Sequence, residues 1–310
     1  MSICLAFPSR VRLAAPVRVF YYAGMGILRV FSSNALSCRA FLFACLLMTG
    51  VARGDAAPGW QELEAGLQFA SFVPSEADSA ANVDILRIDP DFFRFSLHSV
   101  SAEGSAPHSL PGWAEHADLA LAINASMYLP DHVTSTGYLR YGPHVNNPGI
   151  HSKFGAFFVA EPDVPDLPKA AILDRESDPW TERLPRYTLV IQNYRMIDTD
   201  GKSLWLPGGP EHSIAAVGQD KQGHILFIHC RAPMTGEAFA AALLRMPLAL
   251  RSLMYVEGGS QAAMLVSCPK LRRFWIGQSS RSFLHPSENG AALPNVLGAR
   301  RRVEQVIDNN

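Results

Sequence analysis

The sequence predicts an α+β fold, a single domain built on one mixed, largely antiparallel sheet with a few packed helices. Two observations lead to this prediction. Predicted strands outnumber predicted helices, and several neighbouring strands are joined by short turn-forming sequences, which is typical of antiparallel pairs. The chain of 310 residues is 48 % hydrophobic and 18 % charged, as in ordinary globular proteins. No internal repeat is visible, so we expect one large domain and not a doubly wound parallel sheet.

The first 54 residues differ in charge from the rest of the chain. They contain six arginines and no acidic residue, and the first acid is Asp55. A short apolar run over residues 40–48 follows Arg39, and small residues surround position 54, as in a secretory signal peptide. The run is shorter than the roughly 20 residues that span a membrane. We expect a leader over residues 1–54, either cleaved or retained as an anchor, and an exported domain over residues 55–310 in the periplasm or outside the cell.

The first half of this domain reads as strands and a long loop. Alternating apolar residues predict strands over residues 67–73, 83–88 and 93–97. The turn sequence Asp89-Pro-Asp91 predicts that the last two form an antiparallel hairpin. A buried strand is expected over residues 119–123, ending at Asn124. The turn-rich connection over residues 129–152 follows it, and loops of this length are often functional.

The second half continues the strand pattern and adds one helix. Four more strands are predicted, over residues 154–159, 187–191, 195–197 and 253–256. Residues 161–186 read as a surface excursion. Residues 213–217 and 224–229 flank a glycine-containing turn and predict a hairpin. Thr235 is expected to cap a helix that ends at Met246.

Charge and motif content exclude several classes of function. The 27 basic and 28 acidic residues nearly cancel, and without the leader 21 basic residues face 28 acidic ones. A nucleic-acid binder driven by net positive charge is therefore excluded, and the basic run over residues 300–302 is expected to be solvated. The phosphate-binding glycine loop, the dinucleotide fingerprint, the nucleophile elbow of serine esterases and the zinc-protease motif are all absent from the sequence.

Two cysteines follow the leader, Cys230 and Cys268. In an exported chain they form either a disulfide or two buried thiols, and the sequence leaves both open. No cysteine or histidine spacing indicates zinc. We expect no cofactor. The sequence leaves open whether acidic and amide groups beside a phosphate bind a divalent ion.

Three segments share one pattern, in which an apolar strand runs into a polar or glycine-rich end. They are Ala122-Ile-Asn-Ala-Ser-Met-Tyr128, Tyr187-Thr-Leu-Val-Ile-Gln-Asn193 and Leu253-Met-Tyr-Val-Glu-Gly-Gly-Ser-Gln261. Strand ends suit reactive groups, because the strand fixes their position while the following loop exposes them.

These segments resemble the phosphodiester glycosidase family. Its members carry an "INAGMF"-like segment, a glutamine-containing strand, a glycine-bounded hairpin and a late "YLDGGGS". The corresponding stretches here occur in the same order, at residues 123–128, 189–192, 214–223 and 255–260. The resemblance spans about residues 60–268. Ser126, Glu257 and Gln261 depart from the pattern, standing where glycine, aspartate and another small polar residue are usual.

The resemblance implies hydrolysis of a sugar C1–O–phosphate linkage. Such cleavage builds positive charge on the sugar ring, which a nearby carboxylate stabilises or attacks. Glu257 is the candidate catalytic carboxylate and Asp131 is the second candidate. The leaving phosphate ester needs fixed hydrogen-bond donors more than a strong acid. Gly258, Gly259 and Ser260 are candidates to present backbone N–H groups to it as an anion nest.

Five more residues are candidates for substrate binding. Asn124 and Gln192 carry amides that suit sugar hydroxyls or phosphate oxygens. His151, Lys153 and His212 are candidates to supply positive charge near the phosphate. Each has a structural alternative, such as bracing a strand end or a loop. If the chain is an enzyme, Glu257, Asn124 and Gln192 should converge in one pocket.

The expected partner is a carbohydrate or sugar-phosphate substrate, in surface polysaccharide metabolism for example. Contact with a membrane is expected only through an uncleaved leader, and the sequence leaves the oligomeric state open. The three departures from the family pattern keep an alternative in view. In it, the chain is a non-catalytic carbohydrate-binding or polysaccharide-assembly protein on the same scaffold.

Overall fold

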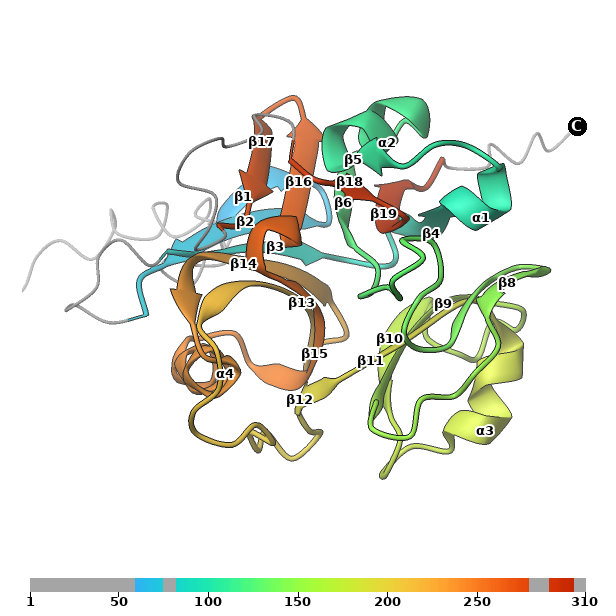
Figure 1. The fold of residues 1–310 in the computed structure, drawn as a ribbon. Coiled ribbons are helices and arrows are strands. Elements are labelled where there is room, and N and C mark those ends of the chain that lie inside the picture. Colours follow the sequence, from blue (N-terminus) through green and yellow to red (C-terminus); the bar gives the residue numbers. More distant parts are fainter. Residues whose placement is uncertain (1–58, 75–81, 279–289, 304–310) are drawn as a thin grey trace, which may run out of the picture. The chain divides into compact units, whose positions relative to one another are not determined.

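A computed structural model describes residues 59–74, 82–278 and 290–303, and shows a fold made mostly of strands (Figure 1). The expected leader, residues 1–54, lies outside these ranges. In the described residues every strand pair is antiparallel, and three sheets of five or more strands replace the single mixed sheet that the sequence predicts. The fold is therefore richer in strands than an α+β prediction implies.

The largest sheet has seven strands. In spatial order they are β1 (Gln61–Glu64), β2 (Leu67–Phe72), β3 (Val83–Ile88), β14 (Ile225–Met234), β13 (His212–Asp220), β15 (Leu250–Gly258) and β12 (Arg195–Ile197). The predicted hairpin over residues 213–229 is confirmed as β13 and β14. Helix α4 (Gly236–Arg245) packs beside this sheet, and the predicted cap is confirmed, because the Thr235 hydroxyl accepts a hydrogen bond from the Ala238 N–H.

Two five-stranded sheets complete the fold. One runs in the order β10 (Ala170–Asp174), β9 (Ala156–Pro162), β11 (Tyr187–Asn193), β7 (Leu139–Tyr141) and β8 (His144–Asn147). The other runs in the order β17 (Leu271–Ile276), β16 (Ala263–Cys268), β6 (Leu121–Asn124), β19 (Asn295–Arg301) and β4 (Phe93–Ser99). The remaining elements are short: β5 (His108–Ser109), β18 (Ala292–Leu293), α1 (Val100–Glu103), α2 (Leu110–His116), α3 (Trp180–Arg183), and the 3₁₀ turns Leu184–Arg186 and Gly259–Gln261.

One hydrophobic core joins the three sheets. Phe95 on β4 lies edge-on to Phe158 on β9, with ring centroids 5.4 Å apart, and to Phe227 on β14, with centroids 6.2 Å apart. All three rings are fully buried. Because each ring comes from a different sheet, the sheets share one interior.

The predicted pairing of residues 83–88 with 93–97 is wrong. The turn between them forms, with the Phe92 and Phe93 N–H groups donating to the Asp89 carbonyl. The two strands then part, because β3 lies between β2 and β14 while β4 pairs with β19. A turn sequence specifies a reversal of the chain, and distant strands with apolar faces decide the pairing.

Other predictions had mixed outcomes. Residues 161–186 are not only a surface excursion, because they contain the buried edge strand β10. The two cysteines in the described ranges, Cys230 and Cys268, are buried, and no disulfide joins them to each other. The described helices include none that is long and apolar enough to cross a membrane.

Candidate active site

The three strand-end segments meet in the structure although they belong to three different sheets. The Asn193 side-chain amide, at the end of β11, donates a hydrogen bond of 3.0 Å to the Ala125 carbonyl just beyond β6. The Asn124 amide, at the end of β6, donates one of 2.9 Å to the Gln261 carbonyl just beyond β15. These two bonds tie the three strand ends together and place Glu257 beside them.

The Asn124 side chain forms hydrogen bonds with main-chain groups. This side chain is buried, and besides the bond to Gln261 its amide oxygen accepts from the Ala263 N–H at 2.7 Å. Both ends of the amide are therefore occupied by the backbone at the start of β16. The side chain sets the path of the chain between Glu257 and β16.

Gln192 also binds main chain, at the other side of the site. It is fully buried, and its amide oxygen accepts from the N–H groups of His151, at 2.8 Å, and Tyr138, at 3.2 Å. Its amide nitrogen donates to the carbonyls of His151, at 3.0 Å, and Phe154, at 2.9 Å. These four bonds attach Tyr138, within the long turn-rich connection, and residues 151–154, at its end, to β11.

Glu257 is a buried carboxyl near the end of β15. Only 7 % of the residue is exposed, and one oxygen accepts from the Gly258 N–H at 2.9 Å. Burial raises the pKa of Glu257 to about 7, and the bond from Gly258 opposes that rise. No arginine, lysine or histidine in the described ranges forms an ion pair with it. Glu257 can therefore gain or lose a proton at neutral pH, which suits general acid–base chemistry.

Two tyrosines that sequence reasoning missed stand next to Glu257. The pKa values of Tyr128 and Tyr255 are both raised, first by burial and then by the charge of Glu257. The Tyr255 hydroxyl lies 3.2 Å from Nε2 of His212, and Tyr128 bonds to the Gln261 side chain. Both tyrosines lie within the segments that the sequence singled out, but an aromatic residue at a strand end carries no signal of its own.

The two glycines after Glu257 serve different needs. A Cβ on Gly258 would lie 2.2 Å from the Tyr255 hydroxyl and 2.4 Å from the His212 ring, so this position needs glycine for close approach. Gly259 has a φ of +66°, and a Cβ there would meet no atom of the described residues within 4 Å, so this position needs glycine for its backbone conformation. Ser260 is half-buried in the 3₁₀ turn that follows. The Gly258 N–H already binds Glu257, which reduces the predicted anion nest.

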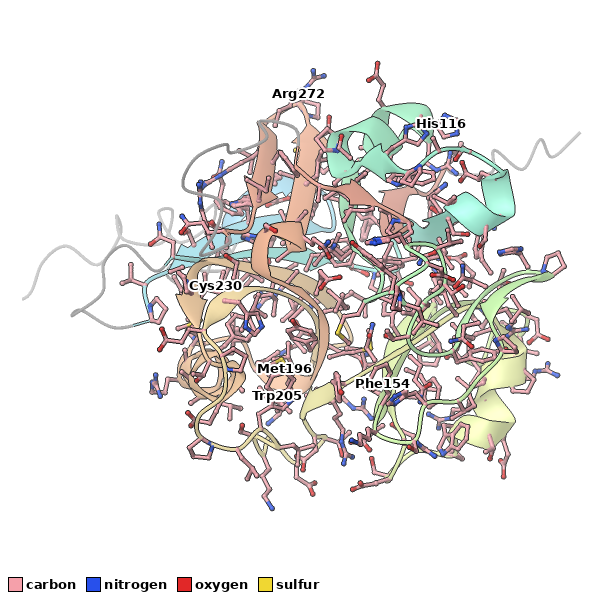
Figure 2. The ribbon with its side chains drawn as sticks, viewed as in Figure 1. His116, Phe154, Met196, Trp205, Cys230 and Arg272 are labelled. Atoms are coloured by element: carbon pink, nitrogen blue, oxygen red, sulfur yellow. The ribbon has the colours of Figure 1, made fainter. Side chains whose placement is uncertain are left out.

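A row of aromatic rings connects two of the other candidates, His151 and His212. It begins at His151, which stacks on Phe154 with centroids 4.0 Å apart, and continues to Tyr194 at 4.4 Å. Trp205 lies 6.1 Å from Tyr194 and 5.3 Å from Tyr255. Figure 2 labels Phe154 and Trp205 in this part of the molecule. The row links His151 to the Tyr255–His212 pair.

A hollow of about 450 Å³ opens beside this row. Its lining includes Lys153, Arg175, Glu176, Tyr194, Arg195 and Trp205. Arg195 is paired with Asp174 and, at 2.8 Å, with Glu176, whereas Lys153 has no ion pair within the described residues. Aromatic faces next to free positive charge suit a sugar that carries a phosphate.

Asp131 lies outside this group. It is exposed, and its oxygens accept from the Thr134 hydroxyl and from the N–H groups of Thr134 and Val133. These hydrogen bonds, that from the Thr134 hydroxyl first, lower the pKa of Asp131. The carboxylate caps its own turn, and no contact in the described ranges joins it to Glu257.

Three buried polar atoms close to Ala125 have no hydrogen-bond partner among the residues that the structure describes: Oγ of Ser126, Oδ1 of Asn193 and Oδ1 of Asn295. Asn193 donates to the Ala125 carbonyl, and the Asn295 carbonyl accepts from the Ala125 N–H at 3.2 Å. Unsatisfied buried polar atoms are rare because each one is costly. Asn295 lies far along the chain from the three segments, so no sequence signal indicated it. Within the described residues no cluster of three or more histidine, cysteine, aspartate or glutamate side chains is placed to hold a metal ion.

Comparison with known proteins identifies the family. The sequence matches the phosphodiester glycosidase family over residues 117–300, which is more than half of the chain. The chain belongs to the phosphodiester glycosidase family. The matched range contains Asn124, Gln192 and Glu257, and the earlier resemblance is confirmed. A comparison with curated proteins finds no match.

Solved structures agree with this family fold. The catalytic domain of zebrafish N-acetylglucosamine-1-phosphodiester alpha-N-acetylglucosaminidase, auto-inhibited by its pro-peptide, is 13 % identical with a TM-score of 0.55. That match covers 78 % of this chain and 86 % of the zebrafish chain. A hypothetical protein from Synechocystis is 12 % identical with a TM-score of 0.51, over 80 % of this chain and 64 % of the other. At these identities the likeness concerns the fold alone.

Proposed function

We propose that the chain is an exported phosphodiester glycosidase that hydrolyses a sugar C1–O–phosphate linkage beside Glu257. The observation that carries this proposal is the convergence of three strand ends, from three sheets, around one buried carboxyl whose pKa is about 7. Membership of the phosphodiester glycosidase family supports a hydrolase of this type.

The chemistry follows from the surroundings of Glu257. In its ionised form, this carboxylate stabilises the positive charge that builds on the sugar ring or takes a proton from the attacking water. The departing phosphate ester is a stable anion, so it requires hydrogen-bond donors and not a strong acid. Ser260, His212 and Lys153 are the donors proposed for it. Asp131, which caps its own turn, is given no step.

Turnover of chromogenic sugar-1-phosphodiesters by the full chain tests this function. Glu257→Gln keeps the shape of the side chain and an acceptor for the Gly258 N–H, but it removes the carboxylate. We expect kcat to fall by about 10²–10⁴-fold, which is the usual effect of losing such a group. Glu115→Gln is the matched control, because Glu115 is exposed and forms no ion pair within the described ranges.

The pH profile adds a second readout. Wild-type kcat/KM should rise through about pH 7, as Glu257 loses its proton. Absence of turnover by the wild type on every sugar offered would end the enzymatic proposal, and so would equal turnover by wild type and Glu257→Gln.

The non-catalytic alternative has one specific observation in its favour. Both amide N–H groups of Gln192 donate to main-chain carbonyls, and the Asn124 amide binds main chain through its nitrogen and its oxygen, so both side chains brace the backbone. Saturable glycan binding by calorimetry, with no product by mass spectrometry, would favour a carbohydrate-binding or assembly role. Export is part of either proposal. It is tested by determining the compartment of the protein and the N-terminal residue of its mature form.

A further inference from the structure

An arginine-rich groove lies at one end of the five-stranded sheet that contains β6 and β16, and Asn124, which bonds to the segment after Glu257, lies at the other end. Ala120, directly before β6, lines the groove, and β6 runs from there to Asn124 at the candidate site. Strand β16 runs from Ala263, beside Asn124, back to Cys268 in the groove. At about 3.3 Å per residue, the four steps from Ala120 to Asn124 span roughly 13 Å. Figure 2 shows Arg272, in the groove, and Trp205, near the candidate site, on opposite sides of the described fold.

The groove has a volume of about 1000 Å³ and a positive lining. Its basic residues are all arginines: Arg94, Arg272, Arg300, Arg301 and Arg302. Glu64 and Asp118 are the acids among the lining residues, so this lining carries three net positive charges. The arginines come from β4, the start of β17 and the end of β19, so sequence reading of any one segment would not have revealed the groove.

Three of the arginines are held by acids. Arg301 pairs with Glu64 at 3.0 Å. Arg302 contacts both oxygens of Glu161, at 2.8 and 3.2 Å, and Arg94 lies 3.4 Å from the same carboxylate. The expectation that residues 300–302 are merely solvated therefore fails for Arg301 and Arg302. These pairs fix the wall of the groove.

The other two arginines are available to a ligand. Arg272 and Arg300 are exposed, and neither forms an ion pair within the described ranges. A guanidinium presents a planar fork of donors that matches two oxygens of a phosphate, whereas a lysine offers only a point charge. The three paired arginines share the two carboxylates of Glu64 and Glu161, so the wall beside these forks keeps a positive charge. The two forks together form a site that binds anionic groups at two points along a polymer.

We propose that this groove binds phosphate groups of a linear polyanionic glycan, with Arg272 and Arg300 making the contacts. No aromatic side chain lines the groove in the described residues, so it lacks the stacking platform that binds nucleic-acid bases. The choice of phosphate over carboxylate rests on the proposed function, because a substrate with sugar–phosphate links carries phosphate along its length. The groove would then hold a polymer while its end reaches Glu257.

Binding of fluorescently labelled inorganic polyphosphate to the full chain tests the proposal without requiring turnover. The variant is Arg272→Gln with Arg300→Gln. Its matched control is Lys221→Gln with Arg245→Gln, which removes the same charge from two exposed residues outside the groove that form no ion pair within the described ranges. We expect the groove variant to bind polyphosphate at least about tenfold more weakly and the control to stay within about twofold of wild type.

Salt dependence gives a second measure. Loss of two phosphate contacts should reduce the slope of log K against log salt by about 1.4.

Dextran, as a neutral polymer, should not bind, and hyaluronan, which carries carboxylates only, should bind more weakly than polyphosphate. Equal binding by the groove and control variants would overturn the proposal. Tighter binding of hyaluronan would overturn the choice of phosphate, and tighter binding of oligo(dT) of equal charge would point to a nucleic-acid groove instead.

The groove proposal and the proposed hydrolase function are tested by different measurements, so one can be refuted while the other stands. The groove variant should hydrolyse a small sugar-1-phosphodiester as fast as wild type, since such a substrate does not reach the groove. Polyphosphate binding that depends on Arg272 and Arg300, in a chain without hydrolase activity, would leave the groove standing and end the proposed function.

Discussion

Glu257 links the chemistry of the site to the stability of the fold. Its pKa is about 7 in the folded chain, compared with about 4.3 for a glutamate in water. The folded state therefore holds a proton that the unfolded state has released between these two values, and stability falls as the pH rises from about 4.3 to 7. Above pH 7 both states are ionised and no further change is expected from this group.

Replacing Glu257 by glutamine removes this dependence. We expect the stability of Glu257→Gln relative to wild type to increase from pH 5 to pH 8, by on the order of 2–3 kcal/mol. Urea unfolding of both proteins across this range measures the difference. Burial lowers the pKa of His229 to about 4, but that group contributes equally to both proteins and cancels in the difference. A difference that does not change with pH would show that Glu257 titrates normally.

The two glycines after Glu257 predict two distinct defects. Gly258→Ala forces a methyl group against the Tyr255 hydroxyl and the His212 ring, so it should displace that pair and reduce turnover strongly. In Gly259→Ala the added methyl group meets no atom of the described residues, so the change should lower stability by only about 1–2 kcal/mol through the left-handed backbone at this position. Thermal unfolding and turnover, measured on both variants, separate the two effects. Equal loss of turnover in the two variants would contradict this distinction.

At the scale of elements, Gln192 joins β11 to the connection that precedes β9. Gln192→Ala removes four hydrogen bonds to main chain, and it leaves buried N–H and C=O groups without partners. We expect a loss of about 3–5 kcal/mol in the free energy of unfolding. Hydrogen exchange should increase at the Tyr138 and His151 amides in particular. Gln222→Ala is the control, because Gln222 is exposed and its side chain forms no hydrogen bond within the described ranges. Exchange confined to other regions would contradict the bracing role.

Sequence patterns predicted the local elements well and the pairings poorly. The α4 cap at Thr235 and the β13–β14 turn depend on neighbouring residues, so the sequence reveals them. The separation of β3 from β4 depends on partners more than a hundred residues away for each strand. The site residues follow the same rule. Glu257 stood out in its own segment, whereas Trp205 and Asn295 reach the site only through tertiary contacts.

At the scale of the whole molecule, the three sheets share one core and should unfold together. Phe95 contacts both Phe158 and Phe227, so its truncation weakens contacts among all three sheets. We expect Phe95→Ala to lower the free energy of unfolding by about 3–5 kcal/mol while leaving a single cooperative transition. Circular dichroism and tryptophan fluorescence should report the same midpoint. Separate midpoints would show that the sheets are independent units.

Strand β19 has a consequence for how the protein is made. It lies between β6 and β4, although some 170 and 200 residues separate it from them along the chain. Neither of those strands can complete its hydrogen bonding until β19 itself has left the ribosome. We therefore expect this sheet to form only after β19 has been synthesised, a delay that would suit the proposed export of the chain in an unfolded state.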